Sequence, residues 1–168
     1  MSDHVETARA TVFAEYHLFR ISDPAGPVVA DDVDGTDNGL VMATDGSIEI
    51  MTGIHTGEVD LTVARCEHEP EPAAGNWEEI AEISLHSPSG KVIVHALMGD
   101  EADVPTLAAS GAGDYRLRVH ARGRDTAVDV AVEEIVEWYL IQCWPAPAGP
   151  AGAGQSKRRL RRGTTCKA

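Results

Sequence analysis

The sequence lacks the long apolar runs that membrane helices need. No window approaches the roughly 18 consecutive apolar residues of a spanning helix. The start, MSDHVETARA, has no cationic segment followed by an apolar one, as a secretion signal would. These absences argue against membrane insertion and secretion, so we expect a cytoplasmic protein that does not bind membranes.

Cysteine is scarce, and the spacing of Cys66, Cys143 and Cys166 matches no metal-binding pattern. In a reducing compartment an odd number of cysteines indicates buried or idle thiols. A bridge between Cys66 and Cys143 would require the two strands that carry them to lie side by side. Cys166 is the third residue from the end and not the fourth, which excludes a prenylation motif.

Catalytic motifs are absent as well. The sequence contains no GxSxG, P-loop, GxGxxG or HExxH pattern, and its seven histidines are scattered. No pair of carboxylates is singled out for acid–base chemistry. We therefore expect neither an enzyme nor a bound cofactor, and the histidines and cysteines predict no metal site.

Cations are rare throughout the first 156 residues. This part carries all 27 acidic side chains and only eight cationic ones, a formal charge of −19, whereas the remaining six cations lie in the last residues, mostly from Lys157 to Arg162. Phosphate binding needs clustered Lys and Arg, so the acidic part is not expected to bind nucleic acid. Its charge instead favours a basic protein as the partner.

The hydrophobic pattern has a period of two almost everywhere, which is typical of strands. A first strand runs from Val12 to Phe19 and is apolar on both faces, as in a central strand. Asp45-Gly46 predicts a tight hairpin between 39–44 and 47–54. Further strands are expected at 57–67, 114–122 and 135–144, and a second hairpin joins 77–86 to 91–98 around Ser87-Pro88-Ser89-Gly90.

These segments predict an all-β protein, an antiparallel β-sandwich of about eight strands with a disordered C-terminal tail. The stretch 127–136 has the alternative of a short helix, because Val128, Val132 and Val136 recur at helical spacing, although β-branched residues favour strands. We expect one β-sandwich domain at 1–146, followed at 147–168 by a Pro/Ala/Gly linker and the basic tail, whose composition is too poor in apolar residues to fold.

Gly113-Asp114-Tyr115 opens a strand in which Tyr115 faces inward, and its hydroxyl is expected to bond a nearby backbone group as in a tyrosine corner. The opposite face carries a cationic row. We interpret this row as a surface feature that pairs with Glu82, Glu133 or Glu137, in preference to a phosphate-binding stripe. The row comprises Arg116, Arg118, His120 and Arg122.

Two acidic loops stand out, at 31–37 and 100–103. The first resembles the opening of a calcium loop, but the twelfth position counted from Asp32 is Ala43, where an EF-hand needs a glutamate. We therefore interpret both loops as surface features and as the candidate partner-binding residues. These residues are Asp31, Asp32, Asp34, Asp37, Asp100, Glu101 and Asp103.

The order of the segments resembles the competence protein J (ComJ) family. The succession is YHLF at 16–19, GLVMATDGSIEI at 39–50, WEEIAEISLHSPSGKVIVHALMGD at 77–100, GAGDYRLRVHARG at 111–123 and EWYLIQCWPA at 137–146. The resemblance covers residues 12–146. The basic tail and the loop EHEPEPAAGN at 67–76 depart from the family pattern.

This resemblance implies a small bacterial β-protein that inhibits a DNA-entry nuclease by binding it, in line with the expectation of a basic partner. Two other classes stay open from the residues alone. One is a calcium- or small-ligand-binding sandwich that uses Asp32 and Asp34. The other is a structural or developmental interaction protein whose Lys157 to Arg162 segment contacts nucleic acid or an anionic membrane.

Overall fold

The computed structural model describes residues 5–33 and 35–156, and within them it contains ten strands and no helix. No helix suited to crossing a membrane is therefore found among these residues. In chain order the strands are β1 Val5–Ala14, β2 Leu18–Ser22, β3 Val41–Thr44, β4 Ser47–Met51, β5 Gly57–Cys66, β6 Glu79–Ser87, β7 Ile93–His95, β8 Gly113–Arg122, β9 Trp138–Pro145 and β10 Gly152–Ser156.

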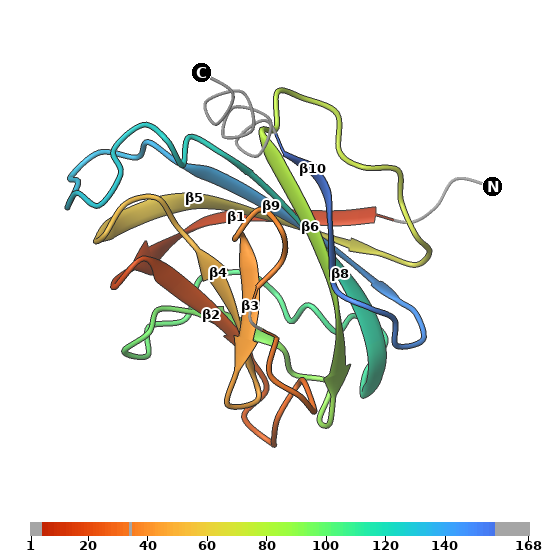
Figure 1. Ribbon diagram of the computed structural model, residues 1–168. Helices are drawn as coiled ribbons and strands as arrows, with labels where there is room; N and C mark the ends of the chain where they lie inside the picture. Colours follow the sequence, from red (N-terminus) through yellow and green to blue (C-terminus); the bar gives the residue numbers. More distant parts are fainter. Residues whose placement is uncertain (1–4, 34, 157–168) are drawn as a thin grey trace.

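The strands form two sheets, which confirms the expected all-β fold (Figure 1). The larger sheet has the order β1-β5-β9-β8-β6-β10, and the smaller one β3-β4-β2-β7. All pairs are antiparallel except β5 and β9, which run parallel. The inner faces pack against each other through residues such as Phe19 and Tyr139, whose rings meet edge to face at 5.2 Å.

The expectation of a central strand from Val12 to Phe19 is wrong. The chain reverses at residues 15–18, where the backbone amides and carbonyls of Glu15 and Leu18 bond each other, so that this segment contains a hairpin turn. β1 before the turn is an edge strand of the larger sheet, and β2 after it lies inside the smaller one. The Asp45-Gly46 hairpin is confirmed, with Thr44 paired to Ser47.

The second expected hairpin, joining 77–86 to 91–98, is also wrong. β6 belongs to the larger sheet and β7 to the smaller one, so the intervening turn carries the chain from one sheet to the other. The buried carboxylate of Asp23 holds this turn by accepting hydrogen bonds from the hydroxyls of Ser87 and Ser89. Although burial opposes it, these bonds and those from backbone amides lower the pKa of Asp23 to about 2.

Tyr115 takes the expected role at the start of β8. Its buried hydroxyl donates to the Gly111 carbonyl at 2.6 Å and accepts from the Ser110 amide at 2.9 Å. These bonds fasten the loop before β8 to the strand itself, as a tyrosine corner does. Here the sequence interpretation is confirmed.

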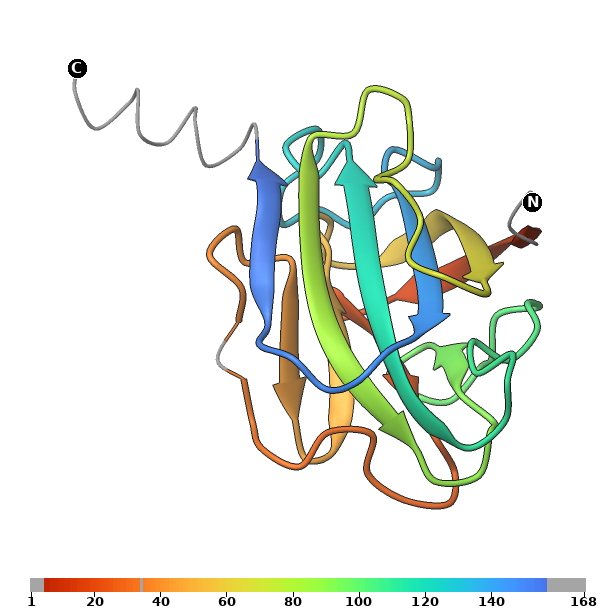
Figure 2. The ribbon, with the colours of Figure 1, turned by 90° about the vertical axis from the view of Figure 1, so that its right-hand side faces the viewer.

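The cationic row of β8 is covered rather than solvated. Loop 67–77 crosses the outer face of the larger sheet (Figure 2), where Arg118 donates to the Pro70 carbonyl and His120 accepts from the Ala73 amide. Glu82 pairs with Arg118, as expected, and also with Arg116. The expected pairing with Glu137 is wrong, because that side chain lies fully buried in the core, and Glu133 lies in the loop that precedes β9.

The two cysteine-bearing strands do lie side by side, with Arg65 opposite Cys143. Cys66 nevertheless packs beside Trp144 on the outer face, whereas Cys143 belongs to the main core, and no disulfide joins the two. Burial raises the pKa of the Cys143 thiol. Gly152–Ser156, expected in the tail, forms β10 beside β6, so the sheet extends past the domain boundary predicted at residue 146. Lys157 to Arg162 and Cys166 lie outside the described residues.

Acidification is expected to weaken the fold through His120. Its ring is fully buried, bonds the Leu140 carbonyl through Nδ1 and accepts the Ala73 amide at Nε2. Burial lowers the pKa of His120 to about 4 from the ordinary value of 6.5. Below pH 6.5 His120 takes up a proton in the unfolded chain, whereas in the folded chain it stays neutral until about pH 4. The free energy of unfolding should therefore fall by roughly 2 to 3 kcal/mol across this window.

Urea denaturation at several pH values measures this loss. In a His120→Gln variant the slope of stability against pH should become shallower between pH 6.5 and 4, whereas His68→Gln, at an exposed position, should leave the slope unchanged. Equal slopes in both variants would contradict the assignment to His120.

Candidate protein-interaction surface

The first predicted acidic loop lies beside β3. Val33 and Ala43 exchange backbone hydrogen bonds, which place Val33 beside the edge of the smaller sheet. Asp31, Asp32 and Asp37 are exposed, and the Asp32 carboxylate accepts the Asp45 amide at 3.2 Å. Asp34 lies outside the described residues, and within the described ones no group of three or more metal-ligating side chains is assembled.

The second predicted loop lies beside β7, where backbone bonds join Ala96 to Asp100 and Ala102 to Val94. Asp100, Glu101 and Asp103 are exposed. Because β3 and β7 are the opposite edges of the four-stranded sheet, the width of that sheet separates the two loops. With neighbouring strands about 4.8 Å apart, the structure does not bring the two predicted loops together into one patch.

The β1–β2 turn has an unusual backbone for its sequence. Tyr16 and His17 both have positive φ angles, 53° and 67°, between the paired residues Glu15 and Leu18. Two-residue turns of this kind favour Asn-Gly, because bulky side chains are strained there by about 1 to 3 kcal/mol each. The Tyr16 side chain is 64% exposed at the tip of the turn.

The turn is held in place by the loop between β8 and β9. His17 Nε2 lies 2.8 Å from a carboxylate oxygen of Asp129, which itself has a positive φ of 62°. His55 contacts both turn residues edge on, with ring centroids 5.5 Å from Tyr16 and 4.9 Å from His17. Three of the four non-glycine residues with positive φ among those described thus lie at one place.

The loop itself is fixed against residues 53–57. Backbone bonds join Asp129 to Gly53, His55 to Val130 and Val132 to Thr56. A Cβ atom on Gly53 would lie 1.9 Å from the Arg124 carbonyl oxygen, so this close approach requires glycine. The buried carboxylate of Glu137 accepts the amides of Gly53 and Ile54. The backbone beneath the turn is therefore rigidly positioned.

Exposed apolar side chains gather around the turn. The Met98 amide bonds the Glu15 carboxylate at 3.3 Å, which brings the 81% exposed Met98 and the adjoining acidic loop 100–103 toward Tyr16. Phe13 precedes the turn, and Val128 and Val130 flank Asp129. Figure 1 shows these segments at the left of the molecule. We name residues 13–18, 53–58, 96–98 and 127–135 together the turn surface.

The charge of the turn surface is of one sign. Its four segments contain no Lys or Arg. Its exposed acidic residues are Glu58, Asp129, Glu133 and Glu134. Exposed apolar side chains with acidic residues among them are the composition expected of a contact area for a cationic protein.

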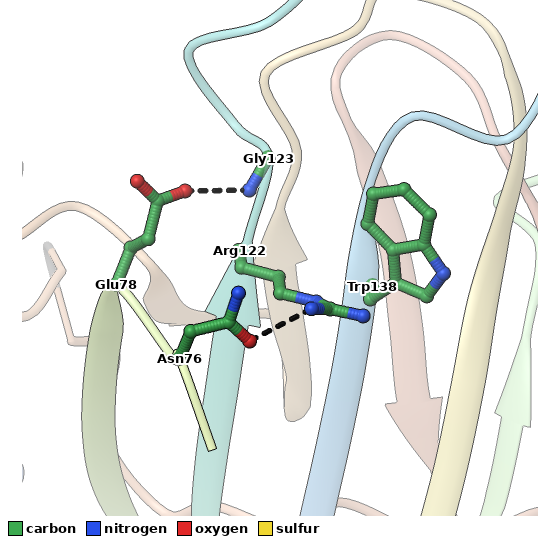
Figure 3. Close-up of a pocket in the computed structure, with 5 residues that line it drawn as sticks. All are labelled: Asn76, Glu78, Arg122, Gly123 and Trp138. Atoms are coloured by element: carbon green, nitrogen blue, oxygen red, sulfur yellow. Dashed lines mark hydrogen bonds between the residues drawn. The ribbon is translucent and has the colours of Figure 1, made fainter.

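A separate cavity of about 320 Å³ opens where β8 ends and β9 begins. Its lining residues are Asn76, Glu78, Arg122, Gly123 and Trp138 (Figure 3). Arg122 donates to the Asn76 amide oxygen and lies over the Trp138 ring, while Glu78 accepts the Gly123 amide. These polar groups bond each other, so the cavity wall contributes to holding loop 67–77 and the loop after β8 in place.

The fold and the surface define an all-β, two-sheet protein with a strained aromatic turn on an acidic face. No protein-family model and no curated protein sequence matches the chain. Two solved structures share its fold. One, described as crocagin biosynthetic gene J, is 13% identical with a TM-score of 0.51 and covers 86% of this chain and 99% of its own.

The other is ComJ from Bacillus subtilis, described as an inhibitor of the DNA-degrading activity of NucA. It is 14% identical with a TM-score of 0.50, and the match covers 87% of this chain and all of ComJ. The resemblance to ComJ expected from the order of the segments is therefore confirmed at the level of the fold.

Sequence reasoning missed the residues of the turn surface. Tyr16 and His17 were assigned to a strand, because Glu15-Tyr16-His17 contains none of the Gly, Asn or Asp residues that mark two-residue turns. Asp129 was placed in a segment expected to be strand or helix. No local signal in the sequence indicates that these three residues meet.

Proposed function

We propose that this protein binds a nuclease and inhibits it, in the manner implied by ComJ. The observation that carries the proposal is the shared fold with an inhibitor of NucA over almost the whole of both chains. The formal charge of −19 on residues 1–156 supports it independently, because an enzyme that binds DNA must present cations to the phosphates.

The inhibitor acts by occupying this cationic surface, and no chemical step is needed. Its carboxylates take the place of phosphates, so that DNA and the inhibitor compete for the same groove. Long-range attraction between an acidic inhibitor and a basic enzyme accelerates their encounter. The same charge repels DNA from the inhibitor itself.

The test uses the purified full chain and the nuclease most similar to NucA from the same organism. We expect DNA cleavage to fall stoichiometrically as the protein is added. The association rate should decrease roughly tenfold or more when NaCl is raised from about 50 to about 500 mM, because salt screens the steering.

An unrelated protein of the same net charge serves as the control and should leave cleavage unchanged. Full nuclease activity at an excess of this protein would exclude the inhibitor role. If the protein inhibits the nuclease but its association rate does not depend on salt, the inhibitor role stands and the proposed electrostatic acceleration of binding is wrong.

A further inference from the structure

We propose that the turn surface is the face through which the protein contacts its cationic partner, with Tyr16 as the anchor of the contact. This assignment rests on the proposed function for the identity of the partner as a nuclease. It replaces a contact spread over the two acidic loops, because those loops lie at opposite edges of the smaller sheet.

The first support is the backbone of the turn. Tyr16 and His17 occupy positive φ angles that Asn-Gly would adopt without strain. Asn-Gly at these two positions would therefore make the fold more stable, and a turn that served folding alone would favour that pair. A bulky aromatic side chain in a strained, exposed position is instead typical of a site where the side chain has a role outside the fold.

The second support is the way the anchor is pre-ordered. The edge contact with His55 and the His17–Asp129 bond hold the turn before any partner arrives. A tyrosine that is already positioned loses little conformational freedom on binding and can bury a large ring area. Tyrosine is among the residues that most often dominate binding energy at the centre of interfaces.

The third support selects the partner's charge. The turn surface has exposed Glu58, Asp129, Glu133 and Glu134 and no Lys or Arg. A second copy of the same face would place like charges opposite one another, which disfavours self-association through it. Nucleic acid is disfavoured for the same reason. A cationic protein surface is the occupant that complements both the exposed apolar side chains and the acidic ones.

Site-specific photo-crosslinking in the native host tests the location. A photoreactive phenylalanine analogue is placed at position 16, two residues before Leu18, which pairs with Met51 at the end of β4. The matched control position is exposed Asp32, which bonds the Asp45 amide in the turn at the other end of β4. We expect position 16 to capture one basic protein, identified by mass spectrometry, and position 32 to capture none. Crosslinking from position 32 alone, or from neither position, would overturn the assignment.

The identity of the captured protein separates the two proposals. A basic nuclease supports both. A basic protein without nuclease activity supports the contact face and refutes the proposed function. An acidic protein or nucleic acid at position 16 refutes the contact face proposed here, whatever the nuclease assay gives.

A stability–affinity comparison gives the second test. In the double variant Tyr16→Asn/His17→Gly, the relaxed turn should raise Tm by about 2 to 4 °C. Affinity for the purified captured protein should drop about 30-fold or more. Asp31→Asn/Asp32→Asn is the control and should leave affinity within about threefold, because that loop lies away from the contact. A lower Tm with unchanged affinity would show that the turn residues serve folding alone.

Discussion

Replacing Glu137 with alanine is expected to lower the free energy of unfolding by about 3 to 5 kcal/mol. Its fully buried carboxylate accepts the amides of Gly53 at 3.1 Å and Ile54 at 2.6 Å and the Tyr139 hydroxyl at 2.6 Å. Alanine leaves these three donors without an acceptor in an apolar core, where each lost bond is costly. Urea denaturation followed by fluorescence measures the effect.

The Tyr139 hydroxyl keeps its proton and donates to Glu137, because burial, with the Glu137 charge nearby, raises the pKa of Tyr139 well above its ordinary value. Glu134→Ala, in the same loop but exposed, is the control and should change stability by no more than about 0.5 kcal/mol. Since residues 53–57 support the loop with Asp129, Glu137→Ala should also weaken binding to the partner. Equal denaturation midpoints for the two variants would contradict this role of Glu137.

Arg124→Ala is expected to have an effect of similar size, also about 3 to 5 kcal/mol. Its guanidinium lies 2.6 Å from the Glu79 carboxylate and donates to the Gly39 carbonyl at 3.0 Å. Both charged side chains are almost completely buried, so alanine leaves the Glu79 carboxylate in the interior deprived of this cation. Thermal and urea denaturation both report the loss.

The ion pair of Arg9 with Asp60, in which only the cation is exposed, provides the comparison. The Arg9 side chain is 70% exposed, so Arg9→Ala should lower the free energy of unfolding far less than Arg124→Ala. If Arg124→Ala were as mild as Arg9→Ala, the buried pair would contribute no more than a surface one. That result would contradict the stabilising role assigned here to the buried pair of Arg124 and Glu79.

Local features of the fold could be predicted from the sequence. Asp45-Gly46 gave the hairpin of β3 and β4, and Gly113-Asp114-Tyr115 gave both β8 and the bonds of the Tyr115 hydroxyl. These predictions hold because each depends on residues within a few positions of one another. Turn preferences and the two-residue period of strands act over that range.

Pairings between distant segments could not be predicted in the same way. The turn at 87–90 resembles a hairpin turn, but the carboxylate of Asp23, more than 60 residues earlier, directs the chain into the other sheet. β5 and β9 are joined in parallel across an intervening run of three strands. Nothing within β5 or β9 specifies the other as its neighbour.

For the candidate site, too, the sequence predicted the local features and not the contacts between distant segments. The acidic residues of both loops were correctly expected at the surface where the structure describes them, because several adjacent charges are costly to bury. Their separation to opposite edges depends on the strand order of the smaller sheet. Tyr16, His17 and Asp129 meet because the β1–β2 turn packs against the loop between β8 and β9, which is more than 100 residues away in the sequence.

By itself the sequence determined the all-β class, the acidic character of the chain and the hairpins whose turns contain Asp and Gly, since alternation, charge and turn geometry are properties of neighbouring residues. The tertiary structure decided which strands pair, which face carries the exposed aromatic turn and where the carboxylates lie relative to it. Those features arise from contacts between segments tens of residues apart, whose free energy depends on the whole assembled core and not on any one segment.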